Sequence, residues 1–321
     1  MVRTPGCWCD VSDIMQHRSA GPHRTTRGRA VMPITVTPLG EYLRARRALV
    51  QPEDVGIVSL TPRRVAGLRR DEVARRAGIS QEYYLRLEQG RDRQPSDQVL
   101  HALGRALNLE AVAVDHMSRL VRMQAGEAPM EAPAPATEVL AALAGLLDQW
   151  TGTPAYIMDG NQDVVIVNPL ARAMTGGGLR PGVNLPLAVF SSAGRAMLED
   201  WPDAAARTAA TLRYGSDPRD RRLQEIVGTL SVRDDDFRQL WSRHDARPYL
   251  NGSVRQHVHG YGPVTLACQT LEVPGPRRFV LTAFHAPAGS EGAAALAGLG
   301  RRPGAAPGGP VRATAVGAAA G

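Results

Sequence analysis

Residues 68–90 read LRRDEVARRAGISQEYYLRLEQG and carry the clearest structural signal in the first part of the chain. Apolar residues recur at helical spacing over 69–77, and Gly78 follows them as the expected C-cap. Ser80 is a good N-cap for a second helix over 81–89. The two predicted helices are therefore joined by a short turn, which lets them cross one another.

Helical patterns also flank this pair of helices. Before it, apolar residues recur at helical spacing over 39–49, and a loop with Pro and Gly follows over 50–67. After it, Ser96 opens a helix with a clear apolar stripe, and 112–121 has the pattern of a last helix. We therefore predict an all-α bundle of five helices over residues 37–122.

The positive charge of the chain is concentrated in its first part. The formal net charge is +7, and residues 126–321 contain equal numbers of basic and acidic residues. All 38 basic residues are arginines, whose planar guanidinium group suits phosphate and guanine. This distribution favours an anionic partner for the first part of the chain, and a neutral ligand or a protein contact for the second.

The second helix of the pair carries side chains that suit base recognition. A helix in this position can enter the major groove, where its first residues face the edges of the bases. Gln81 can bond adenine, Glu82 can accept a hydrogen bond from cytosine, and Arg86 can bond guanine. We predict these three residues as base contacts. The predicted phosphate contacts are Arg69, Arg70, Tyr83, Arg91 and Arg93.

The length of 321 residues allows about two domains, and residues 138–285 have the pattern of a second, α+β domain. Two β-like runs within 155–167 are joined by a turn, which predicts a hairpin. Helical segments dominate 192–244, and three β-like runs within 253–284 close the domain. Such a domain offers a concave face to a ligand. The residues predicted to line this ligand pocket are Tyr156, Phe190, Trp201 and Trp241.

Three segments lack the pattern of a folded domain. Residues 1–36 show no apolar periodicity and are predicted to be a disordered N-terminal extension, unless the gene starts later, at Met32. Residues 123–137 are rich in Ala, Pro and Glu and are predicted to be a linker. Residues 286–321 consist mostly of Ala, Gly and Pro and are predicted to be a disordered tail.

Several classes of protein do not fit this sequence. It contains no run of about 18 apolar residues, so no membrane-spanning helix is expected. Three cysteines make no disulfide framework, which favours a reducing cytoplasm. No phosphate-binding loop, nucleophile elbow or metal-ligand spacing is present, and the adjacent His244 and Asp245 do not form a natural catalytic dyad. We therefore predict no enzymatic activity, no metal and no cofactor.

The helix pair resembles the helix-turn-helix of the XRE family, which is also called lambda-repressor-like. The residues that carry this resemblance lie at 68–74, 77–80, 87–90 and 95–96. The resemblance covers about 39–121 and implies a five-helix bundle that binds operator DNA, usually as a homodimer. The base-reading positions of that family fall on the three predicted base contacts. Arg69 stands where the family often has a Ser or Thr cap.

The chain from 39 to 285 also resembles a narrower group, the MmyB-like actinobacterial regulators. The residues that carry this resemblance lie at 52–56, 67–70, 84–92, 154–157, 164–168, 237–241 and 244–245. It implies that residues 138–285 form a PAS-like ligand-binding domain, which can hold a fatty-acid-like molecule. The stretch around His257 departs from the pattern of the group and is a residue short.

Together these features predict a cytoplasmic, sequence-specific DNA-binding transcription regulator. The expected fold is an all-α N-terminal helix-turn-helix bundle of five helices plus an α+β, PAS-like C-terminal domain. Helix 81–89 is expected to read the major groove, under the influence of a small apolar, fatty-acid-like ligand in the second domain. The expected partners are double-stranded DNA, this ligand and a second copy of the chain, but no membrane. Two alternatives remain open: the second domain only dimerises, or the bundle binds a protein as an anti-regulator.

Overall fold

A computed structural model gives the fold of most of the chain. The structure describes residues 37–57, 63, 65, 67–92, 94–125, 135–273 and 278–301. The predicted N-terminal extension 1–36, the predicted phosphate contact Arg93, the middle of the predicted linker (126–134) and the end of the predicted tail (302–321) lie outside the described residues.

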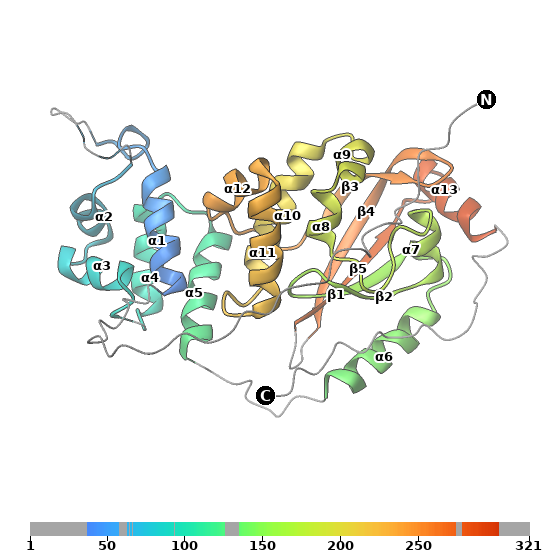
Figure 1. The fold of residues 1–321 in the computed structure, drawn as a ribbon, viewed down its shortest axis with the longest axis horizontal. Coiled ribbons are helices and arrows are strands. Elements are labelled where there is room, and N and C mark those ends of the chain that lie inside the picture. The colour runs from blue at the N-terminus through green and yellow to red at the C-terminus, as the bar shows by residue number, and fades with distance from the viewer. Residues whose placement is uncertain are drawn as a thin grey trace, which may run out of the picture.

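The first part of the chain is a bundle of α-helices (Figure 1). The helices are α1 (Pro38–Leu49), α2 (Arg70–Ala77), α3 (Gln81–Glu88), α4 (Asp97–Ala106) and α5 (Ala111–Ala125), with a short 3-10 helix (Glu53–Val55) after α1. Their apolar sides meet in one core, in which Tyr42, Tyr84, Leu87 and Met117 are fully or almost fully buried. The prediction of a five-helix bundle is thus confirmed for the described part of residues 37–125.

The boundaries of the helix pair follow from the residues that the sequence places there. Gly78 adopts a left-handed conformation with φ of +67°, which suits glycine, and ends α2. The Ser80 side chain accepts a hydrogen bond from the amide of Tyr83 at 3.1 Å and caps α3. Ser96 caps α4 in the same way, with the amide of Val99. The predicted turn and caps are confirmed.

A buried carboxylate fastens three helices of the bundle to each other. Glu88, at the end of α3, is 0% exposed. Its carboxylate accepts from Nε of Arg47 on α1 and from Nε of Arg70 on α2, both at 2.7 Å. Burial by itself would raise the pKa of Glu88, but these two guanidinium groups outweigh it and hold the pKa below its ordinary value. The carboxylate therefore stays charged and fixes α3 relative to α1 and α2.

The second part of the chain is built on a five-stranded antiparallel sheet. The strands are β1 (Ala155–Asp159), β2 (Val164–Val167), β3 (Gly252–Val258), β4 (Gly262–Val273) and β5 (Phe279–His285). They lie in the order β2-β1-β5-β4-β3, and β1 and β2 form the predicted hairpin. Ile157 lies opposite Leu281 on one face of the sheet, and Tyr156 lies opposite Thr282 on the other face.

Helices cover both faces of this sheet. They are α6 (Ala136–Asp148), α7 (Pro169–Met174), α8 (Leu185–Val189), α9 (Ser192–Met197), α10 (Trp201–Gly215), α11 (Arg221–Arg233), α12 (Asp235–Ser242) and α13 (Glu291–Gly300). α6 packs on the face that carries Ile157 and Leu281. α7 and α13 pack on the other face, against Leu266 and Phe284. The predicted α+β class is confirmed.

Two predicted boundaries differ from the structure. α13 lies within 286–321, which was predicted to be a disordered tail, and its residues Leu296 and Leu299 are buried against α7 and β4. The bundle likewise extends beyond the predicted start of the linker at 123, because α5 continues to Ala125. Its last turn is held by Arg219 of the second domain, which donates to the carbonyl of Met123 at 2.6 Å. Both segments are ordered by tertiary contacts that their composition does not reveal.

We predict that Glu88→Ala strongly destabilises the bundle. The change leaves Arg47, a mostly buried cation, without its counter-charge, which costs about 3–5 kcal/mol of unfolding free energy. Denaturant unfolding of the full chain measures this. The matched control is Glu82→Ala, which removes an 82% exposed partner of Arg86 and should cost less than about 1 kcal/mol. Equal losses in the two variants would contradict the role of Glu88.

Candidate DNA-binding face, ligand pocket and domain interface

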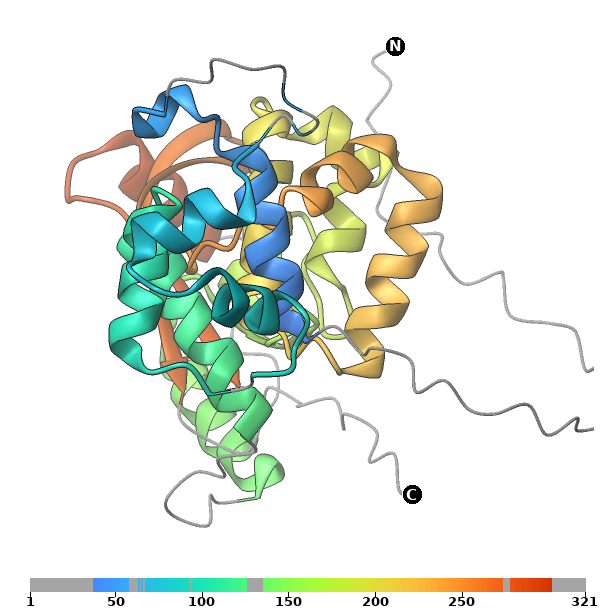
Figure 2. The ribbon, with the colours of Figure 1, turned by 90° about the vertical axis from the view of Figure 1, so that its left-hand side faces the viewer.

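The exposed side of α3 carries all three predicted base contacts. Gln81, Glu82 and Arg86 are exposed, while Tyr84 and Leu87 on the same helix are buried. Arg86 lies 3.7 Å from the carboxylate of Glu82. Seen from the end of the molecule that carries α2 and α3, nothing of the second domain stands in front of these helices (Figure 2). The face is open to a large partner.

Two of the predicted phosphate contacts, Arg69 and Arg70, lie at the start of α2 and are exposed. Nε of Arg70 is bound to Glu88, so one edge of its guanidinium group is held while 44% of the side chain remains accessible. Arg69 does not cap α2 through its side chain. Instead, its backbone N–H donates to the carboxylate of Glu72 at 2.6 Å, and Glu72 is in turn held by Arg63.

The other predicted phosphate contacts differ in exposure. Arg91 is exposed in the loop after α3, and Arg93 lies outside the described residues. Tyr83 is half-buried and packs against the core of the bundle. The guanidinium carbon of Arg86 lies 5.5 Å from the centre of its ring, within the range of a cation–π contact. The ring of Tyr83 thus packs against the guanidinium of Arg86, and part of the Tyr83 side chain remains exposed.

A pocket of about 210 Å³ lies between the sheet and the helices α7, α8 and α9. Tyr156 and Phe284 contribute from the sheet. The remaining apolar lining comes from Met174, Leu179, Val183, Leu185, Ala188, Val189, Met197 and Leu198. Thr175, Gln256 and His257 are the polar residues of the lining, and the exposed side chain of His257 lies on the face of β3 opposite to that of Gln256. The volume lies below the usual range of about 300–1,000 Å³ for ligand pockets, which favours a small, mostly apolar ligand.

The predicted set of pocket residues is only partly brought together. Tyr156 lines the pocket, but Phe190, Trp201 and Trp241 lie in a separate aromatic cluster around Phe237. In that cluster Phe190 is edge-on to Phe237 and Trp201, and Phe237 stacks on Trp241, with ring centres 5.1–5.7 Å apart. Placing these three aromatic residues in the pocket was wrong, because the tight packing of α8, α10 and α12 occupies them.

The bundle and the second domain meet where α5 faces the end of α10. His116 on α5 is 2% exposed and lies between two tyrosine rings. The ring of Tyr42 is 5.1 Å away on the bundle side, and that of Tyr214 is 6.3 Å away on the side of the second domain. Arg119 places its guanidinium 3.8 Å from the centre of the Tyr214 ring and donates to the carbonyl of that residue. His116 and Arg119, one turn apart on α5, therefore both contact Tyr214.

A second group of contacts surrounds the segment after α12. Arg46 of α1 pairs with Asp245 at 2.5 Å, which joins the two domains directly. The guanidinium carbon of Arg213 lies 3.8 Å from the centre of the Trp241 ring. The same guanidinium group donates a hydrogen bond to the backbone carbonyl of Trp241 at 2.7 Å. Nη1 of Arg213 is 3.1 Å from Nδ1 of His244. The sequence pattern did not predict the contact of His244 or the pairing of Asp245, because no local pattern indicates a contact between distant segments.

The two histidines at this interface are neutral near pH 7. Burial, helped by the neighbouring cations Arg119 and Arg213, lowers the pKa of His116 to about 3. Burial, together with Arg213 and Arg46, lowers the pKa of His244 to about 4. A neutral imidazole can pack between aromatic rings and arginines, whereas an imidazolium there would be repelled.

The described residues offer neither a metal-binding cluster nor a reactive cysteine. Among the described residues, no group of three or more His, Cys, Asp and Glu side chains is arranged to hold a metal ion. Burial raises the pKa of Cys268 to about 11, which keeps its thiol protonated and unreactive. None of the helices in the described ranges combines the length and the apolar character needed to cross a membrane.

Comparisons with known families match both parts of the chain. A family model described as a helix-turn-helix domain matches residues 38–117. A second model, described as the MmyB-like transcription regulator ligand binding domain, matches residues 139–299. A comparison with curated proteins found no match. The first range coincides with the bundle, and the second contains the sheet, the pocket and nearly all of α13.

We predict that acidification weakens the folded state through His116. Its pKa is about 3 in the folded chain and about 6.5 in the unfolded chain, so only the unfolded chain takes up a proton between these values. The contribution of His116 to stability is therefore lost as the pH falls below about 6.5, by about 2 kcal/mol at pH 5. Chemical unfolding at pH 7 and pH 5 measures the total loss, to which His244 adds in the same direction, and a variant of His116 isolates its own share.

His116→Asn is expected to lower stability at both pH values, because the side chain is packed, but to shrink the loss between them. The matched control, His101→Asn on the exposed side of α4, should keep the loss of the parent. A loss of the same size in His116→Asn and in the parent would show that His116 does not cause it.

Proposed function

The chain belongs to the MmyB-like transcription regulators, and we propose that α3 reads operator DNA while the pocket of the second domain binds a small, fatty-acid-like ligand. One observation carries the DNA-reading part of this proposal. Gln81, Glu82 and Arg86 are exposed on one helix at the end of the molecule that lies away from the sheet domain (Figure 1). Their side chains match adenine, cytosine and guanine in the major groove.

Arg69, Arg70, Tyr83, Arg91 and Arg93 are proposed to contact phosphates beside this groove. Arg70 has the strongest physical support. Its guanidinium is held by Glu88 at 2.7 Å, so less rotamer freedom is lost when its outer edge binds a phosphate. The amides at the start of α2 lie beside Arg70 and add to the attraction. Such contacts place the helix in the groove without selecting a sequence.

The second domain is proposed to bind its ligand in the pocket between the sheet and α7–α9. The apolar lining, with Leu185, Val189 and Phe284 among its residues, suits a hydrocarbon chain. Gln256 lies in the wall and offers hydrogen bonds to a polar end such as a carboxylate. The modest volume of about 210 Å³ favours a short chain.

The chain is further proposed to act as a homodimer. Two copies of α3 would then read half-sites about one helical turn of DNA apart, and the symmetry of the operator would reflect that of the protein. A ligand that alters the relative placement of the two α3 helices would alter the affinity for such an operator.

We predict that selection from a random duplex library enriches one sequence motif for the full-length chain. Arg86→Ala or Gln81→Ala should cost about 1–3 kcal/mol on that motif and relax one base position, because a side chain that reads a base edge is lost. Arg91→Ala should instead weaken binding to every duplex and flatten its salt dependence.

The matched control for these changes is Arg221→Ala, at an exposed arginine of α11 in the other domain, which should bind as the parent does. A two-fold symmetric motif would support the dimer. If the parent enriches no motif with or without octanoate, the bundle does not read DNA, and the role of an anti-regulator that binds protein gains support.

We predict that octanoate raises the melting temperature of the chain by binding in the pocket. At about 100 times its Kd, a ligand of the folded state adds about 2.7 kcal/mol to the free energy of unfolding. Ala188→Phe should abolish this effect, because the larger side chain fills the pocket. The matched control is Val232→Phe, at a position that is 82% exposed on α11. Stabilisation of the Ala188→Phe variant to the same degree would place octanoate elsewhere, and a second domain that only dimerises would show no effect.

A further inference from the structure

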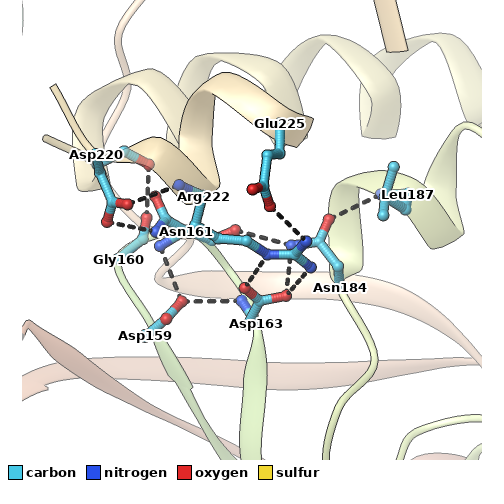
Figure 3. Close-up of polar contacts among 10 residues, drawn as sticks. Asp159, Gly160, Asn161, Asp163, Asn184, Leu187, Asp220, Arg222 and Glu225 are labelled. Carbon is cyan, nitrogen blue, oxygen red and sulfur yellow. Dashed lines mark hydrogen bonds and ion pairs between the residues drawn. The ribbon is translucent and has the colours of Figure 1, made fainter. Parts of the chain in front are cut away.

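The turn between β1 and β2, residues 159–163, has an internal structure that is set by a buried carboxylate. Oδ1 of Asp159 accepts from the amide of Asn161 at 2.9 Å and from that of Asp163 at 3.0 Å (Figure 3). Gln162 completes the turn in a left-handed conformation with φ of +61°. Burial, together with the charge of Asp163, raises the pKa of Asp159 to about 6. The shape of this turn is therefore closely defined.

On one side, this turn is bonded to the wall of the ligand pocket. Asn184 caps α8 by accepting from the amide of Leu187 at 3.1 Å. Its Nδ2 donates to the carbonyl of Asn161 and to the carboxylate of Asp163, both at 3.0 Å. The next residue, Leu185, lines the pocket. A ligand that displaces the start of α8 therefore also displaces the turn, through the hydrogen bonds of Asn184.

On a second side, the turn is bonded to the start of α11. Arg222 donates two hydrogen bonds to Asp163, at 2.8 and 2.9 Å, in a bidentate arrangement. Nδ2 of Asn161 donates to Asp220 at 2.8 Å, and Asp220 caps α11. Figure 3 shows these side chains converging on the turn from α8 and α11. The turn thus ties the start of α8 to the start of α11, two helices that also pack against each other.

On a third side, the turn touches the end of α10, next to the domain interface. The carbonyl of Gly160 accepts from Oγ of Ser216 at 2.9 Å. A Cβ atom on Gly160 would lie 2.8 Å from the carbonyl oxygen of Gly215, so only glycine allows this approach of the two backbones. Tyr214 precedes Gly215, and its ring and carbonyl are the groups that Arg119 of α5 holds.

We propose that Asn161 and Asn184 are positioning residues that transmit occupancy of the pocket, through this turn, to α5 of the DNA-binding bundle. The route consists of direct contacts from α8 to the turn and from the turn to α5. The turn reaches α5 through Asp220 and the adjacent Arg219, whose guanidinium donates to the carbonyl of Met123. It also reaches α5 through Ser216 and Tyr214 at the end of α10. α5 packs against α1, and α1 packs against α3, which carries the predicted base contacts. Because packed elements move as units, a shift of α8 repositions the contact of Tyr214 with α5. This inference rests on the proposed function, since it requires a ligand in the pocket.

The test uses the full-length chain, octanoate as the probe and the duplex that selection enriches. In the parent, saturating octanoate is expected to change the Kd for the duplex by about fivefold or more. Asn161→Ala removes the bond to Asp220 but no side chain of the pocket or of α3. The variant should bind octanoate, and the duplex without octanoate, as the parent does, while the effect of octanoate on the duplex Kd falls below about twofold.

Two further outcomes are decisive for Asn161. A merely structural role would lower the melting temperature of Asn161→Ala and leave the effect of octanoate on the duplex Kd as in the parent, which would overturn the proposal. The matched control is Arg221→Ala, which removes an exposed ion pair with Glu225 at the start of α11, the helix that Asp220 caps. This control should retain the full effect of octanoate.

A second arm separates failure of this inference from failure of the proposed ligand. Ala188→Phe fills the pocket permanently, and hydrogen–deuterium exchange then reports on the amides of α5. If octanoate does not bind the parent, the proposed ligand class is wrong, but Ala188→Phe should still change the exchange of α5 severalfold, and adding Asn161→Ala should cancel that change. Exchange in α5 that stays the same in Ala188→Phe overturns the relay.

Discussion

The contact of His116 and Arg119 with Tyr214 is the interaction on which the arrangement of the two domains depends. A buried imidazole lies there between two tyrosine rings and among the cations Arg119 and Arg213. Such a site admits only the neutral imidazole, and the arginines are satisfied by ring faces and carbonyl groups instead of carboxylates. Desolvated groups of this kind tolerate little misplacement, so the interface holds the bundle in one orientation with α3 pointing away from the sheet.

The two domains bury carboxylates in opposite ways. Glu88 receives two guanidinium groups, so its charge is stabilised and its pKa lies below the ordinary value. Asp159 receives only backbone amides and lies near the carboxylate of Asp163, so burial and repulsion raise its pKa. The first arrangement suits a rigid bundle in which α3 is held in a fixed position. The second leaves a turn whose charge is costly, at the junction of the pocket and the domain interface.

Local signals in the sequence predicted much of the fold and part of the site. Gly78 and Ser80 placed the turn of the helix pair, because a left-handed residue and a capping oxygen are local requirements. The exposure of Gln81, Glu82 and Arg86 followed from the same helical periodicity. The lining of the pocket did not follow from the sequence. The position of an aromatic residue in an apolar pattern indicates that it is buried, but not which neighbours surround it. α13 was missed because its Ala-rich composition is also that of a disordered tail.

The helix-turn-helix bundle, the hairpin of the sheet domain and the side chains exposed on α3 all follow from the sequence alone. These depend on interactions within a few residues, such as the cap at Ser80, and on periodic apolar faces. Three other features depend on the folded state: the neutral form of His116, the pairing of Asp245 with Arg46, and the connection that Asn184 makes between the pocket and the β1–β2 turn. Each of these joins segments that are far apart in the chain, and desolvation and hydrogen-bond geometry exist only once the chain has folded.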